Sequence, residues 1–129
     1  MEQGKTISEK VIKCAFEVSN QLGAGFLEAV YENALCFELE RQGICFEQQK
    51  PVEVTYRGRV VGYYVTDLLI ENKLLIELKA LSQITNQYEA QVMNYLKAID
   101  VKVGLLLNFG TPKLGIRRLV RQYEETERI

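Results

Sequence analysis

Histidine is absent from this 129-residue chain. Its absence excludes Ser-His-Asp and Cys-His catalysis, histidine general bases and zinc sites with histidine ligands. Cysteine is scarce: Cys14, Cys36 and Cys45 form an odd set without CxxC spacing, so we expect reduced, buried thiols. If the protein is an enzyme, its chemistry must therefore come from carboxylates, lysine, tyrosine or a hard metal ion.

Long apolar runs, repeats and low-complexity tracts are also missing, and prolines number two. No run approaches the ~20 apolar residues that span a bilayer, and the polar N-terminus lacks the apolar segment of a signal peptide. Hydrophobic residues make up 47% and charged residues 26%, which is the ordinary globular range. We therefore expect one cytoplasmic domain over residues 1–129, with a single core and no membrane contact.

Neither sign of charge is in large excess, because 16 basic and 17 acidic residues give a formal net charge of -1. The chain therefore has no global field that attracts nucleic acid, and any attraction must be local. One local candidate exists: Lys113, Arg117, Arg118 and Arg121 fall within nine positions. They are either the cations of a solvated edge strand or contacts to nucleic-acid phosphates, with Lys113, Arg117 and Arg118 as the binding candidates.

Apolar spacing predicts the elements. Helices are expected over residues 7–22, 26–42 and 84–99, the first capped by Thr6 or Ser8 and ended by Gly23 or Gly25. Strands are expected at 44–46, 52–56, 60–70, 73–80, 101–109 and 114–120, and residues 122–129 are charged and expected to fray. The resulting fold class is α/β, a mixed β-sheet flanked by helices in the order ααββββαββ, with parallel strands joined across the third helix.

Three charged residues interrupt the apolar strands 60–70 and 73–80, namely Asp67, Glu77 and Lys79. A turn centred on Asn72 would place Asp67 opposite Glu77, with Lys79 on the same face because it lies two residues further on. A two-residue turn at Glu71-Asn72 would instead move Glu77 to the other face.

Two opposed carboxylates next to a lysine suit a hard cation. Asp67, Glu77 and the backbone carbonyl of Leu78 could hold Mg²⁺, with Mn²⁺ as a substitute. Lys79 could then position an attacking water or stabilise the charge that develops on a phosphate. The competing interpretation is a cross-strand salt bridge in which Asp67 simply pairs with Lys79.

Further polar groups lie on helix faces that should be buried. Gln91 and Tyr95 fall on the apolar stripe of the helix at 84–99, which directly follows the strand that bears Lys79. Both could reach the site, although Tyr95 also fits core packing with a bonded hydroxyl. Glu28, near the start of the second helix, is either a site residue or an acid favoured by the helix dipole.

Taken together, several segments of the chain resemble the GxxExxY protein family. Its signature is similar to residues 25–31, Gly-Phe-Leu-Glu-Ala-Val-Tyr, and its later blocks resemble residues 64–69, 76–80, 89–96 and 104–109 in order. The resemblance covers about residues 7 to 120. It implies a PD-(D/E)XK nuclease with a restriction-endonuclease-like core. Tyr88 stands where the family commonly has a histidine, which puts any role of that histidine in doubt.

The resemblance also implies roles for single residues. Asp67 matches the first metal-binding acid, and Glu77 and Lys79 match the ExK pair. Gln91 and Tyr95 resemble the QxxxY element of RecB-like nucleases, and Glu28 matches the helical acid that often completes such a site. We therefore expect a Mg²⁺-dependent hydrolase, an endonuclease that acts on DNA rather than RNA.

Two further expectations concern assembly and activity. Duplex cutting by so small a unit would suggest a homodimer. The alternative function is a catalytically silent module that keeps the nuclease-like fold and binds nucleic acid or a protein, which the small size favours because there is no separate recognition domain.

Overall fold

Eight elements follow one another in the computed structural model, which describes residues 6–122. They are α1 (Ile7–Leu22), α2 (Glu28–Arg41), β1 (Phe46–Tyr56), β2 (Arg59–Ile70), β3 (Leu74–Lys79), α3 (Asn86–Ile99), β4 (Val103–Asn108) and β5 (Gly115–Val120). The strands form one sheet in the order β1-β2-β3-β4-β5. Only β3 and β4, joined through α3, run parallel within the described sheet. The predicted mixed α/β architecture is therefore confirmed.

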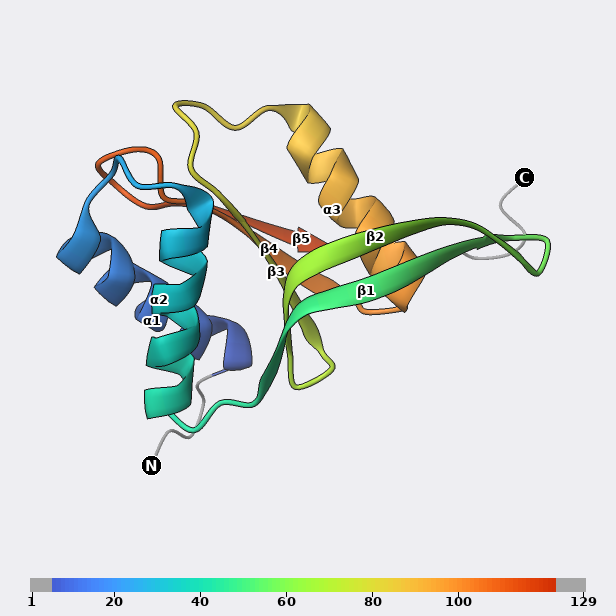
Figure 1. Cartoon of the computed structure of the whole chain (residues 1–129), viewed down its shortest axis with the longest axis horizontal. Coiled ribbons are helices and arrows are strands. Elements are labelled where there is room, and N and C mark those ends of the chain that lie inside the picture. Colours follow the sequence, from blue (N-terminus) through green and yellow to red (C-terminus); the bar gives the residue numbers. More distant parts are fainter. Residues whose placement is uncertain (1–5, 123–129) are drawn as a thin grey trace.

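Helices cover both faces of the central strands. Figure 1 shows α1 and α2 on one side and α3 on the other. Alternate residues of β3 divide between two cores: Leu74, Ile76 and Leu78 pack towards α1 and α2, whereas Leu75 packs with Val92 and Leu96 of α3. This two-sided burial explains why β3 reads as an almost continuous apolar run.

The strand count differs from the prediction by one. The strands expected at 44–46 and 52–56 are a single 11-residue strand, β1, with Pro51 inside it opposite Val65. The polar run before Pro51 suggested a break. However, β1 lies at the edge of the sheet, where a strand tolerates exposed polar side chains and a residue without an N–H. The predicted fraying at the C-terminus concerns residues 123–129, which lie outside the described part of the chain.

The corner between α1 and α2 is built around Tyr31. Its hydroxyl donates to the carbonyl of Gly23 at 2.6 Å and accepts from the N–H of Phe26 at 3.1 Å. Its fully buried ring stacks on Phe109, with 4.9 Å between centroids. Gly25 has φ +121°, a conformation that side chains rarely adopt. This part of the sequence signature therefore fixes where α2 begins.

The ends of the first helix follow the expectation, whereas the second and third helices begin two residues later than expected, at Glu28 and Asn86. Thr6 and Glu9 form a capping box at α1, and Gly23 ends that helix. Leu27 and Val30 fall within the expected second helix, 26–42, yet both are exposed, because α2 begins only at Glu28 and turns its first residues outward. Among the free cysteines Cys14 and Cys36 are buried, whereas Cys45 is exposed just before the edge strand.

Membrane crossing by a helix finds no support in the part of the chain described. None of its helices combines the length and apolar character that a span requires.

Candidate active site

The β2–β3 hairpin has the register that a turn centred on Asn72 predicts. Ile70 pairs with Leu74, and Leu68 pairs with Ile76. Glu71 and Asn72 adopt positive φ of 51° and 58° to turn the chain. The two-residue alternative is therefore wrong, and Asp67 and Glu77 lie across from each other just beyond the last ladder pair.

Asp67 and Glu77 each hold the other strand through one carboxylate oxygen. The backbone N–H of Asp67 donates to Glu77 Oε2 at 2.9 Å, and the backbone N–H of Leu78 donates to Asp67 Oδ2 at 2.8 Å. These side chains take the place of ladder hydrogen bonds where the two strands separate. The second oxygen of each carboxylate remains as an acceptor.

The carboxylates and Lys79 share the α3 face of the sheet. Asp67 stands two residues before Leu69, and Glu77 two residues after Leu75, and both leucines pack in the core beneath α3. Lys79 continues this alternation at the end of β3. The predicted convergence of two acids and one lysine is therefore what the hairpin produces.

Burial makes both acids hold their protons unusually strongly. Burial raises the pKa of Glu77 to about 8, and the negative charge of Asp67 adds to the shift, against the opposing effects of the Asp67 N–H and of Lys79. Burial also raises the pKa of Asp67 to about 6; the Leu78 N–H opposes this, whereas Glu32 and Glu28 add to it. Two acids that cannot both ionise cheaply form a site that a cation would stabilise.

Lys79 lies beside the acids without an ion pair to Asp67. Its Nζ lies 4.8 Å from the ring centroid of Tyr88. Across residues 6–122, the ion pairs formed do not include Asp67 with Lys79, so the simple salt-bridge interpretation fails. The backbone of Lys79 is fixed by the N–H of Phe109, which donates to its carbonyl at 2.8 Å.

Glu32 is a buried acid that the sequence prediction did not assign to the site. Its Oε2 accepts from the side-chain amides of Gln48 at 2.7 Å and Gln49 at 2.8 Å. Gln49 also reaches Asp67 Oδ1 at 3.5 Å, and its φ of 55° marks a local distortion of β1. Glu32 follows Glu28 by one helical turn, a spacing that could have revealed it.

Glu28 and Tyr95 interact with the acids through charge, whereas Gln91 is placed only beside Tyr95. Glu28 is exposed at the start of α2 and acts on Asp67 through its charge. Tyr95 is buried. Its burial raises the pKa of its hydroxyl, and the negative charge of Glu77 adds to this shift. Gln91, one turn earlier on α3, lines the same cleft as Tyr95.

The side chains here supply only some of the ligands that a hard divalent cation needs. No group of three or more acidic or thiol side chains in residues 6–122 is arranged to hold a metal ion. Asp67 and Glu77 supply two carboxylates, which is the number that Mg²⁺ often takes from a protein when water and substrate oxygens complete its octahedron. A cation at these acids would use carboxylate oxygens of Asp67 and Glu77, with the Leu78 carbonyl as the third predicted ligand.

The basic residues predicted to contact nucleic acid do not lie together. Arg117 faces α3 and pairs with Glu89 at 3.2 Å, and Arg118 takes the opposite face of β5. Lys113 lies in the loop before β5. Arg121 binds Asp100 at 3.0 Å and the Leu96 carbonyl at 3.2 Å. These residues form no single patch on β5.

Asn108 is a positioning residue that sequence reasoning missed. Its buried side-chain amide accepts from the N–H of Leu81 and donates to the Leu81 carbonyl, both at 2.9 Å. A Cβ on Gly110 would lie 2.2 Å from the Leu81 nitrogen, so only glycine allows this approach. The clamp fixes the chain two residues after Lys79. A polar residue at the end of an apolar strand was the available signal.

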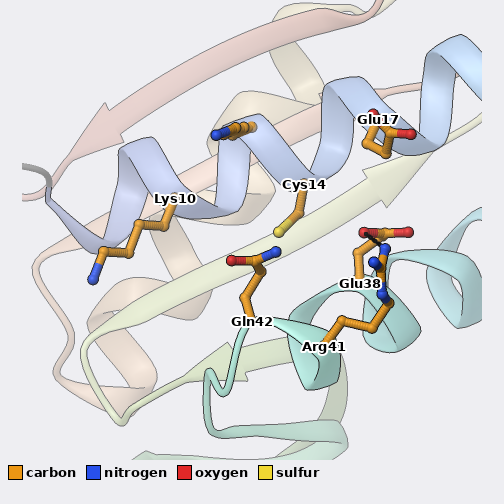
Figure 2. Close-up of a pocket in the computed structure, with 7 residues that line it drawn as sticks. Lys10, Cys14, Glu17, Glu38, Arg41 and Gln42 are labelled. Atoms are coloured by element: carbon orange, nitrogen blue, oxygen red, sulfur yellow. Dashed lines mark hydrogen bonds and ion pairs between the residues drawn. The ribbon is translucent and has the colours of Figure 1, made fainter. Parts of the chain in front are cut away.

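A pocket between α1 and α2 lies apart from these acids. It has a volume of about 380 Å³ and is lined by side chains of both helices. Figure 2 shows Cys14 of α1 above Gln42, at the end of α2, and Glu17 above the ion-paired Glu38 and Arg41. Burial raises the pKa of the Cys14 thiol, which keeps it protonated and a weak nucleophile.

The sheet, its flanking helices and the acid, acid and lysine set define a restriction-endonuclease-like α/β domain. Residues 5–119 match the family model of the PD-(D/E)XK nuclease superfamily, and the chain belongs to that superfamily. Membership indicates a nuclease with a nucleic-acid substrate, and enzymes of this superfamily generally use divalent metal ions.

Thr66 stands where the superfamily's name has proline, and its hydroxyl donates to the Lys50 carbonyl at 3.1 Å.

A solved structure shares the fold. The crystal structure of SSO0001 superimposes with a TM-score of 0.53 and 16% sequence identity, over 95% of this chain and 81% of that one. No curated protein matches the chain.

Proposed function

We propose that the protein hydrolyses phosphodiester bonds of DNA in a Mg²⁺-dependent reaction, with Asp67, Glu77 and Lys79 as its catalytic centre. The observation that supports this proposal is the cross-strand contact of Asp67 and Glu77 on the face that also carries Lys79. Burial makes two charges here costly unless a cation neutralises them. Mg²⁺ at such acids supplies positive charge to the scissile phosphate and lowers the pKa of a bound water.

The chain's own residues divide the remaining work. Asp67 and Glu77 hold the cation, with the Leu78 carbonyl and Glu28 as additional ligands, either directly or through water. Lys79 positions the attacking water and offsets negative charge on the phosphate. Tyr95 and Gln91 orient the substrate beside the acids. Asn108 keeps Lys79 in place by holding the chain at Leu81.

The finer assignments belong to the same proposal. The signature at residues 25–31 supports membership of the GxxExxY family, and the Tyr31 corner gives that signature a structural role. We also propose a single cytoplasmic domain and endonucleolytic cutting. A homodimer and phosphate contacts from Lys113, Arg117 and Arg118 belong to the case in which the substrate is a duplex.

Cleavage of labelled DNA and RNA with Mg²⁺, Mn²⁺ or EDTA tests the proposal. Wild type should cut DNA only with a divalent cation, and Glu77→Ala and Lys79→Ala should lower the rate at least ~100-fold. Glu71→Gln and Lys73→Ala are matched controls, because they change the same kinds of charge in the exposed turn of the same hairpin. Equal activity of the site and control variants, or no cutting by wild type with either metal, would contradict it.

The silent-module alternative predicts a different result. A nuclease-like fold without catalysis would bind nucleic acid or protein and would not need the cation. Isothermal titration of the folded protein with Mn²⁺ separates the two functions. Binding that Asp67→Asn weakens supports the nuclease, whereas an intact fold without Mn²⁺ affinity supports the silent module.

A further inference from the structure

A cleft of about 780 Å³ lies between the β1–β2 hairpin and α3. The hairpin extends past the body of the sheet alongside the end of α3 (Figure 1). Its strands contribute Glu53, Val54, Thr55 and Tyr64 to the lining, and α3 contributes among others Tyr88, Gln91, Asn94, Tyr95 and Lys97. The lining thus combines aromatic rings, amides, one cation (Lys97) and one carboxylate (Glu53).

The cleft adjoins the candidate active site through the tyrosines of its lining. Tyr64 and Tyr95 touch across it, with ring centroids 5.2 Å apart, and the charge of Glu77 acts on Tyr95. Tyr88, on the same wall, has its ring 4.8 Å from Lys79 Nζ. A chain of nucleotides that lies in the cleft would therefore reach the lysine and the acids at its inner end.

We propose that this cleft binds one unpaired strand of nucleic acid, with a base stacked on Tyr64, so that the enzyme acts on single-stranded rather than duplex substrate. The inference rests on the proposed nuclease function and names its substrate class.

Size and chemistry support a single strand. The volume lies in the ~300–1,000 Å³ range of pockets that enclose one small ligand, which suits a few nucleotides and not a double helix. Aromatic faces beside a backbone-contacting cation are the usual means of holding unpaired bases, and stacking tolerates any base. Gln87, Gln91 and Asn94 offer amides to exposed base edges.

The charge distribution gives a second argument against a duplex. Proteins that grip duplex DNA neutralise several phosphates with lysine and arginine. Here the net charge is -1, Arg117 is paired with Glu89, and Arg118 points to the other face of β5. A single strand needs fewer such contacts, because stacking supplies part of its binding free energy.

Two neighbouring tyrosines make a matched test. Tyr64 lines the cleft, whereas its neighbour Tyr63 is 70% exposed and does not belong to the lining. In the Glu77→Gln background, which prevents cutting, we measure fluorescence anisotropy of a labelled single-stranded oligonucleotide and of the same sequence as a duplex. Tyr64→Leu should weaken single-strand binding ~5- to 100-fold, Tyr63→Leu should leave it unchanged, and Tyr64→Phe should restore it.

A second pair guards against a folding defect in Tyr64→Leu. Ala98 is an exposed residue of α3 in the cleft. Ala98→Glu should weaken binding more than Ala98→Gln, which has nearly the same volume, because the added charge repels phosphates. A 2-aminopurine base in the strand should lose fluorescence on binding only where position 64 is aromatic.

The outcomes separate this inference from the proposed function. Preferential cutting and binding of the single strand, lost with Tyr64→Leu, supports both. Mg²⁺-dependent cutting of duplex at an equal or higher rate, with Tyr64→Leu and Tyr63→Leu alike, overturns the single-strand inference and leaves the nuclease intact. Single-strand binding sensitive to Tyr64, without any cutting by wild type, overturns the nuclease and supports the cleft as a binding site.

Discussion

The backbone N–H of Asp67 donates a 2.9 Å hydrogen bond to the carboxylate of Glu77, ten residues further along the chain. One acid therefore depends on the other for both position and charge. Since the Leu78 N–H binds the Asp67 carboxylate in return, the pair stays together without a metal. The site is thus organised by the hairpin itself, and a cation would occupy a place that is already formed.

Stability of the metal-free protein should fall as pH rises from about 4 to about 8. Folding raises the pKa of Asp67 from 3.8 to about 6 and that of Glu77 from 4.5 to about 8. The folded state therefore binds more protons than the unfolded state across this window, and the stabilisation present below it is lost as the pH passes the folded pKa values. Thermal melts in EDTA measure this slope.

Glu77→Gln and added cation give the controls for that slope. Glu77→Gln should flatten the upper part of the profile and raise the metal-free melting temperature at pH 8, whereas Glu71→Gln in the turn should not. Mn²⁺ should restore stability at pH 8 in wild type. A wild-type profile in EDTA that rises with pH would show that the two acids are not perturbed as described.

Asn108→Ala should destabilise the fold and slow catalysis. The change leaves the buried N–H and carbonyl of Leu81 without their partner, at about 1–3 kcal/mol for each group. It also loosens the chain two residues after Lys79. The urea concentration at the midpoint of unfolding and the cleavage rate should both fall in Asn108→Ala. Asn20→Ala, on the exposed face of α1, should match wild type in both. Unchanged cleavage by a destabilised variant would limit Asn108 to a structural role.

Gly110→Ala should lower the free energy of unfolding by about 3 kcal/mol or more. The new Cβ would meet the backbone nitrogen and oxygen of Leu81 at 2.2 and 2.3 Å, and backbone atoms cannot give way cheaply. Gly62→Ala is the matched control, since nothing lies within 4 Å of its Cβ and Ala suits a strand better. Denaturant midpoints should therefore move in opposite directions, and a neutral Gly110→Ala would refute the close approach.

Tyr31→Phe should lower stability by about 1–3 kcal/mol, because Gly23 and Phe26 lose the hydroxyl that joins them. Since this corner fixes the start of α2, the charge of Glu28 near Asp67 should shift as well. Melting temperature gives the first effect, with exposed Tyr63→Phe as its control. The Mn²⁺ affinity gives the second, and an affinity equal to wild type would separate the corner from the site.

Local patterns decided much of the fold and the centre of the site. The spacing of apolar residues determined three helices, and the apolar run of β3 indicated a strand covered on both sides. Asn72 at the centre of the hairpin determined that Asp67 and Glu77 meet, because a strand has a strict period of two.

Tertiary structure decided what depends on neighbours distant in the sequence. Pro51 continues a strand because β1 lies at an edge, and Arg117 and Arg118 part because β5 is a strand with two faces. The raised pKa values of Asp67 and Glu77 come from burial beneath other elements, and the cleft exists only where the hairpin passes α3. Periodicity is written into adjacent residues, whereas burial, charge and cavities are sums over atoms that only folding brings together.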